Sequence, residues 1–193
     1  MTTRLAVPRT RPPAWWGMVV LIMTEATVFA TLLSANFFLR ATSREWPQGG
    51  IEAPHVGARI IVFTVALLAS SAPLVIAERA VGDGRTRTAR VALAASFVLG
   101  LAFLVNQVLE YRDLPFAFRD NAYASSFYAV TGLHGLHVAM GLAMSAVVQL
   151  KVALGKVDER RHLTLDVFAL YWHFVDVVWI FVFASLYVSV RFG

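Results

Sequence analysis

Five apolar segments make up most of the sequence, and each is about as long as a helix that crosses a lipid bilayer. The segments cover residues 15–39, 59–78, 91–111, 123–150 and 165–190. The connections between them are short and hold many of the Pro and Gly residues and most of the charged residues. The hydrocarbon core has no water to pair with the backbone, so a spanning segment of about 20 residues must form a helix. The sequence therefore predicts an all-α polytopic membrane protein: a basic segment, 1–14, followed by one transmembrane domain, 15–193, that forms a five-helix bundle.

Composition agrees with this fold class and excludes several functions. Hydrophobic residues make up 58% of the 193 residues, charged residues make up 15%, and the mean hydropathy is +0.65. These values are typical of a polytopic membrane protein. The absence of cysteine excludes disulfides, thiolate metal sites and cysteine catalysis. The formal net charge is +5, but the basic residues are dispersed over short loops without interleaved aromatics, so no nucleic-acid partner is expected.

The distribution of basic residues predicts the orientation in the membrane. Of the 17 Lys and Arg residues, 11 lie in the N-terminal segment and in the connections 79–90 and 151–164, which share one side of the membrane. The other six lie on the opposite side. The positive-inside rule therefore places the N-terminus in the cytoplasm, and an odd number of spans places the C-terminus outside, on the periplasmic side.

The last apolar segment carries two ionisable residues within the string YWHFVDVVW (171–179). His173 and Asp176 are three residues apart near the middle of this segment, so they share one face of a helix. A charged group at the bilayer centre costs roughly 2.5–3.5 kcal/mol on insertion scales. We therefore expect this face to be buried against protein or water, with the two side chains hydrogen-bonded directly or across a neighbouring helix.

Two glutamates also lie within apolar segments. Glu25 follows Trp15 by ten residues, which is about 15 Å along a helix and near the midplane. A carboxyl group there is expected to be protonated unless it meets a base or water. We interpret it as a proton-exchanging or lipid-contacting group, or as a neutral acid hydrogen-bonded to another helix. Glu110 lies in NQVLEY (106–111), either an interhelical hydrogen-bond cluster or an ordinary polar helix end.

The fourth segment contains two histidines on one helix face, in TGLHGLHV (131–138). The small residues around His134 and His137 allow helices to approach closely. Together with His173 they are compatible with haem or metal ligation from facing helices. The alternative is that they hydrogen-bond to carboxylates across the bundle, with Asp176 and Glu110 as candidate partners.

Four strings occur in order along nearly the whole chain from Trp15. They are WWGMVVLIMTEATVF (15–29), NQVLEYRDLPF (106–116), YASSFYAVTGLHGLHV (123–138) and YWHFVDVVW (171–179). Together they resemble cytochrome c oxidase subunit III, and the last two are highly specific. The resemblance implies a non-catalytic core subunit of a proton-pumping terminal oxidase that reduces oxygen to water. The five-helix form is typical of bacteria, so a multi-pass protein of the bacterial inner membrane is expected.

The resemblance also implies partners and site residues. It implies that the chain packs on subunit I, with subunit II and other subunits nearby, binds phospholipids, and supports proton uptake. It implies no catalytic residue, metal or cofactor in this chain, with haem and copper held by the partner subunits. Glu25 matches the family's carbodiimide-reactive carboxyl near a lipid cleft, and Lys151 matches a basic lipid-headgroup contact. The other matched intramembrane polar positions, associated with protons or lipid, are Glu110, His134, His137, His173 and Asp176.

Longer family members have two additional N-terminal helices that form the other wall of a V-shaped lipid cleft. A cleft built like theirs is therefore expected here only if another subunit supplies that wall. The alternatives within the family are subunit III of a quinol oxidase and a homologue associated with nitric oxide reductase. Thr24-Glu25 and NQVLEY favour the cytochrome c branch. Alternatives of other classes are an independent membrane haem protein ligated by His134 or His137 with His173, and an autonomous proton channel or transporter.

Overall fold

The computed structural model describes residues 11–51, 53–54, 56–158 and 161–191. Within these residues the chain is helical apart from its connections and one isolated β-bridge between Asp158 and Arg161. The α-helices are α1 (Pro13–Thr42), α2 (Ala58–Ala69), α3 (Ser71–Gly82), α4 (Thr86–Asp113), α5 (Ala122–Ala153) and α6 (Leu163–Phe183). A π-helical turn and a 3-10 turn continue α6 as far as Arg191. Most of the predicted basic segment, 1–14, lies outside the described residues.

Five of the described helical stretches are long and apolar enough to cross a membrane. They are Pro13–Thr42, Ala58–Gly82, Thr86–Asp113, Ala122–Ala153 and Leu163–Arg191. The all-α, five-span prediction is therefore confirmed. Each span is longer than its apolar segment because helical backbone continues into the polar ends. At the start of α5, for example, the side chain of Asn121 caps the helix by accepting a 2.8 Å hydrogen bond from the Ala124 backbone N–H.

The second span contains a break that the hydropathy pattern does not reveal. It consists of α2 and α3, separated by a turn at Ser70. Pro73 lacks the backbone N–H that would pair with the carbonyl of Ala69, and its ring crowds that carbonyl. Pro73 therefore ends α2 at Ala69 and brings Ser70 and Ser71 to a bend that faces α6.

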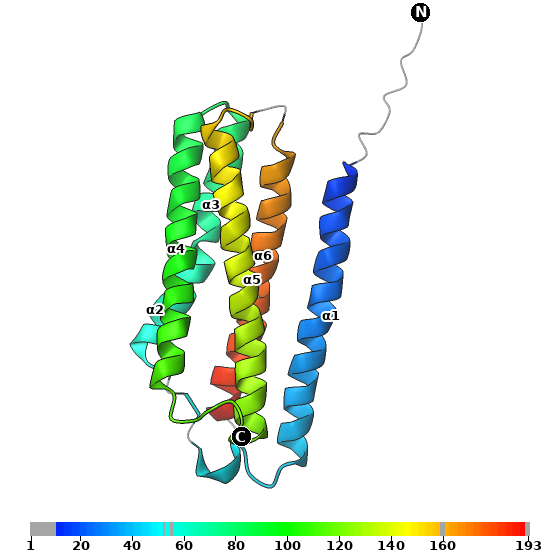
Figure 1. The fold of residues 1–193 in the computed structure, drawn as a ribbon, viewed down its shortest axis with the longest axis vertical. Helices are drawn as coiled ribbons and strands as arrows, with labels where there is room; N and C mark the ends of the chain where they lie inside the picture. The colour runs from blue at the N-terminus through cyan, green and yellow to red at the C-terminus, as the bar shows by residue number, and fades with distance from the viewer. Residues whose placement is uncertain (1–10, 52, 55, 159–160, 192–193) are drawn as a thin grey trace, which may run out of the picture.

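The helices form a bundle in which α6 has a central position and α1 lies at the edge (Figure 1). Helices α2 and α3 pack on α4, α4 packs on α5, and α6 contacts α1, α3 and α5. Half of the most apolar stretch of the last span is buried, whereas the corresponding fraction for α1 is 6%. The start of α1 and the α3–α4 and α5–α6 connections lie at one end of the bundle (Figure 1).

A line of polar contacts joins α1 to the bundle. Glu25 contacts His137 of α5 at 3.2 Å, Asn36 accepts a 2.7 Å hydrogen bond from Ser126 of α5, and Arg40 donates a 3.0 Å hydrogen bond to Ser189. Phe29, between the first two, is also buried. These positions are spaced by four, seven and four residues, so they lie along one face of the helix.

The indole of Trp172 occupies a space that two glycines leave open. A Cβ atom added to Gly100 of α4 would lie 2.7 Å from the ring, and one added to Gly141 of α5 would lie 2.6 Å from it. The Trp172 Nε1–H donates a 2.8 Å hydrogen bond to Ser70 Oγ. Trp172 therefore packs tightly against α4 and α5 and bonds to the bend of the second span.

We expect Gly141→Ala to destabilise the bundle by roughly 1–3 kcal/mol, the usual cost of overpacking a filled core. The matched control is Gly135→Ala on the same helix, where the nearest atom to an added Cβ is Leu104 Cδ1 at 3.8 Å. The control should be neutral or stabilising, because alanine favours helix more than glycine. Unfolding free energies in mixed detergent micelles measure both, and equal values for the two variants would contradict this packing.

Candidate functional site

The first predicted site residue, Glu25, pairs with His137. Glu25 Oε2 lies 3.2 Å from His137 Nε2 across the α1–α5 contact. The Glu25 side chain is 32% exposed and the His137 side chain is 11% exposed. The pair is therefore accessible from the surface of the chain mainly through Glu25. Tyr171 of α6 donates a 3.2 Å hydrogen bond to the backbone carbonyl of His137, and the ring of Phe29 lies 5.1 Å from the imidazole.

The second ring nitrogen of His137 determines the proton count of this pair. His137 Nδ1 lies 2.8 Å from the backbone carbonyl of Leu133, which only accepts, so Nδ1 carries a hydrogen. A neutral His137 therefore presents a bare Nε2, which requires a protonated Glu25 as donor. An ionised Glu25 requires a doubly protonated His137. In both forms one proton lies between the two side chains, and its transfer changes their charges without changing the contact.

His173 and Asp176 meet at the hydroxyl of Ser71. Ser71 Oγ donates to Asp176 Oδ2 at 2.5 Å and lies 2.9 Å from His173 Nδ1. A serine hydroxyl has one hydrogen, so His173 Nδ1–H is the donor in the second contact. The expected contact across a neighbouring helix is therefore present, with α3 as the neighbour. Asp176 is 6% exposed, and its Oδ1 is buried without a hydrogen-bond partner among the described residues.

Glu110 belongs to a buried polar cluster near one end of the bundle. Tyr187 donates a 3.0 Å hydrogen bond to Glu110 Oε1, and Tyr111 and Thr131 share a 2.8 Å hydrogen bond. Glu110 also lines a cleft of about 340 Å³ between the start of α2 and the end of α4. NQVLEY is thus an interhelical cluster rather than an ordinary polar helix end, because Asn106, Gln107 and Glu110 are all buried.

His134 lies in the aromatic core of the bundle. It is fully buried, its ring stacks on Trp179 with centroids 4.8 Å apart, and Phe103 and Phe29 also flank it. Neither ring nitrogen has a hydrogen-bond partner among the described residues. The candidate carboxylates, Asp176 and Glu110, bond to other side chains, so that interpretation was wrong for His134.

Lys151, the predicted headgroup contact, lies near the end of α5. Its Nζ donates a 3.1 Å hydrogen bond to Thr164 Oγ1 at the start of α6, and the side chain is half-buried. In this chain the ammonium group therefore links two helix ends. Its predicted contact with lipid stays a prediction.

The structure does not bring the histidines together as a common ligand set. His137 uses both ring nitrogens in contacts with Leu133 and Glu25, and His173 contacts Ser71 through Nδ1. Among the residues that the structure describes, no group of three or more His, Cys, Asp or Glu side chains is arranged to hold a metal ion.

Several functional partners were missed at the level of sequence. Ser70 accepts a hydrogen bond from the indole N–H of Trp172, and Thr64 accepts one from the indole N–H of Trp179. Ser71 donates one to Asp176. The signal that could have found them is the polar pair Ser70-Ser71 just before Pro73, inside an otherwise apolar segment. Tyr187 of the last span is also buried, with 1% of its surface exposed, and it donates a hydrogen bond to Glu110.

The fold and these contacts define a polytopic helical membrane protein whose ionisable side chains pair within the bundle. Comparison with known proteins identifies the family. The cytochrome c oxidase subunit III family profile matches residues 11–190. Proteins named cytochrome c oxidase subunit 3 from Triticum aestivum, Anopheles gambiae and Danio rerio are each 34% identical over 177 residues. The match covers 89% of this chain and 67%, 68% and 68% of the three relatives.

The chain belongs to the cytochrome c oxidase subunit III family. It is thus a membrane protein and one subunit of a multi-subunit oxidoreductase complex. The resemblance drawn from the four strings is confirmed. The relatives named above come from a plant, an insect and a fish, so the bacterial origin stays a prediction.

We expect Asp176→Ala to destabilise the bundle by about 1–3 kcal/mol, because it removes the acceptor of a desolvated hydrogen bond. Asp176→Asn keeps an acceptor oxygen for Ser71, so its loss of stability should be much smaller. The control is Asp113→Ala, which breaks an exposed 2.7 Å ion pair with Arg59 and should change stability by less than about 1 kcal/mol. The free energy of unfolding in mixed detergent micelles is measured for all three variants. A fully stable Asp176→Ala variant would remove this residue as a structural partner.

Proposed function

We propose that this chain is the non-catalytic subunit III that stabilises subunit I and supports its proton uptake. In this proposal subunit II and further subunits complete the complex, haem and copper reside in the partner subunits, and phospholipids cover part of the exposed surface. The observation that carries the proposal is the 3.2 Å contact between Glu25 and His137. This pair holds a transferable proton and is partly exposed on its Glu25 side.

The exposed surface of α1, the helix that carries Glu25, supports contact with lipid or another subunit. On α1 only Phe29 and Asn36 are fully buried, and large apolar side chains such as Val20, Met23 and Phe38 are at least 60% exposed in the isolated chain. Apolar surface of this kind is suited to acyl chains or to a neighbouring transmembrane helix. A proton on the Glu25–His137 pair is therefore close to whichever molecule covers α1.

The remaining intramembrane polar residues have contacts that suit a structural role. Asp176 and His173 connect α6 to α3 through Ser71, and Glu110 connects α4 to the end of the last span through Tyr187. His134 fills the aromatic core. We propose that these residues hold the bundle in one arrangement, whereas Glu25 and His137 contribute to proton exchange.

We further propose a single transmembrane domain in the bacterial inner membrane, with the N-terminus in the cytoplasm and the C-terminus in the periplasm. The charge distribution supports this orientation, because 11 of the 17 basic residues belong to the N-terminal side. In the fold, the α3–α4 and α5–α6 connections, which carry many of them, lie at the same end as the start of α1 (Figure 1).

We expect Glu25→Gln to preserve assembly of the complex and its haem spectra while removing carbodiimide reactivity and lowering the number of protons pumped per electron. The glutamine amide can still donate to His137 Nε2, so the contact remains and only the transferable proton is lost. The matched control is Glu110→Gln, which keeps its acceptor for Tyr187 and should leave carbodiimide labelling unchanged. Loss of the whole complex in Glu25→Gln would indicate a structural role instead.

The orientation can be measured directly because the chain contains no cysteine. Arg119→Cys lies in the exposed α4–α5 connection, and Lys156→Cys lies in the exposed α5–α6 connection, at the other end of the bundle. A membrane-impermeant maleimide added to intact spheroplasts should label the first variant and not the second. Lysis should make the second reactive. The reverse pattern would contradict the proposed orientation.

A further inference from the structure

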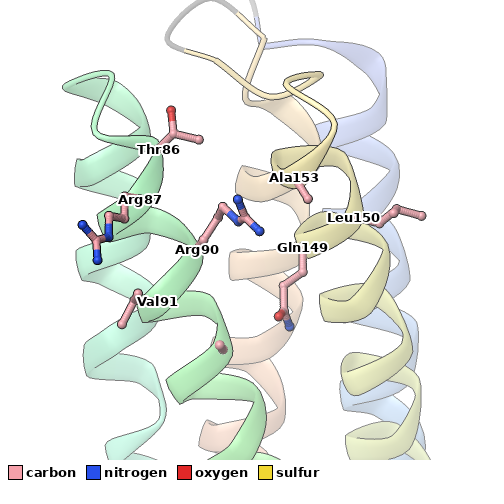
Figure 2. Close-up of a pocket in the computed structure, with 8 residues that line it drawn as sticks. Thr86, Arg87, Arg90, Val91, Gln149, Leu150 and Ala153 are labelled. Carbon is pink, nitrogen blue, oxygen red and sulfur yellow. The ribbon is translucent and has the colours of Figure 1, made fainter.

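A groove separates the start of α4 from the end of α5. Its volume is about 1010 Å³. Thr86, Arg87 and Arg90 of α4 make its polar end, and Val91, Ala94 and Leu150 contribute apolar surface. Figure 2 shows the Arg90 side chain extending from α4 toward α5, close to Gln149, whereas the Arg87 guanidinium points away from α5. The guanidinium of Arg90 therefore faces the space between the two helices, and that of Arg87 lies on the outer side of α4.

The charges of this groove have no counterions among the described residues. Arg87 and Arg90 make no ion pair or side-chain hydrogen bond there. Other arginines at the same end do: Arg85 lies 2.5 Å from Asp83, and Arg161 lies 2.6 Å from Asp158. Two unpaired guanidinium groups beside apolar surface are complementary to an anion that carries an apolar tail.

The depth of the groove fits a lipid. Helix α4 has 28 residues and is therefore about 42 Å long, which matches the thickness of a bilayer with its headgroup layers. Thr86 is its first residue, so Arg90 lies about 6 Å from the helix start, at the level of the headgroups, and Ala94 lies about 12 Å from it, at the level of the acyl chains. Ala153, on the opposite wall, is the last residue of α5.

We propose that this groove binds one anionic phospholipid, with its phosphate on Arg90, flanked by Arg87 and Thr86, and an acyl chain along Val91, Ala94 and Leu150. Basic pockets between transmembrane helices on the cytoplasmic side are known to bind anionic headgroups. A free phosphate ion would use the arginines but not the apolar wall. This inference rests on the proposal that the chain binds phospholipid, but it does not depend on the Glu25–His137 pair.

The test is native mass spectrometry of the full-length chain in detergent micelles, titrated with phosphatidylglycerol. Arg90→Gln should weaken phosphatidylglycerol binding about fivefold. Arg79→Gln is the charge-matched control, because Arg79 is exposed at the same end of the bundle but does not line the groove. The control should change binding by less than about twofold. Ala94→Phe, which fills the apolar part without altering charge, should also weaken binding.

Equal losses in Arg90→Gln and Arg79→Gln would overturn the proposal in favour of diffuse attraction to the basic end of the bundle. Displacement of the lipid by millimolar inorganic phosphate, or phosphatidylcholine binding equal to phosphatidylglycerol binding, would overturn the choice of an anionic lipid.

Phosphatidylglycerol binding that all variants retain would reject this groove but leave phospholipid binding by the chain intact. Absence of any phospholipid binding would reject the broader proposal as well. Loss of the lipid when the chain is part of the purified complex would assign the groove to a partner subunit.

Discussion

Polar side chains inside a bilayer have no water to bond with, and the last span supplies the partners for a large share of those in this bundle. Hydrogen bonds join Trp172, Asp176, Trp179 and Tyr187 to α2, α3, α4 or the turn between α2 and α3. Each of these contacts joins a different level of the bundle. The central position of α6 therefore follows from its polar and aromatic residues as much as from its hydropathy. Lipid is as apolar as leucine, so apolar contact alone would not hold these helices in one arrangement.

Close packing supplies the second source of specificity. The indole of Trp172 fits against backbone at Gly100 and Gly141, and the imidazole of His134 stacks on Trp179 in the same core. Dispersion contacts and small residues are what stabilise helices against one another in lipid. A bundle of this kind places hydrogen bonds and large rings among the aliphatic residues of its core and exposes further apolar residues, such as Val20 and Met23 of α1, on its outside.

Hydropathy predicts the spans because the length of an apolar segment is a property of local sequence. The partners of the site residues depend on which helix faces which, and that depends on the whole fold. His137 was recognised as an intramembrane polar residue, but nothing local pairs it with Glu25, which lies 112 residues away. Ser71 escaped notice because a serine in an apolar segment costs little and carries no charge. His134 had the opposite outcome: its polarity suggested a partner, whereas its ring serves mainly to fill space.

The contacts of α1 have a consequence for how this helix can move. Glu25, Asn36 and Arg40 meet their partners along a single line, and little of the helix is buried between them. An apolar helix face can slide along its neighbour with little change in contact area, but polar groups bond only at set distances. A shift of one helical turn, about 5.4 Å, would break all three contacts together. The three contacts therefore fix the position of α1 along the bundle axis.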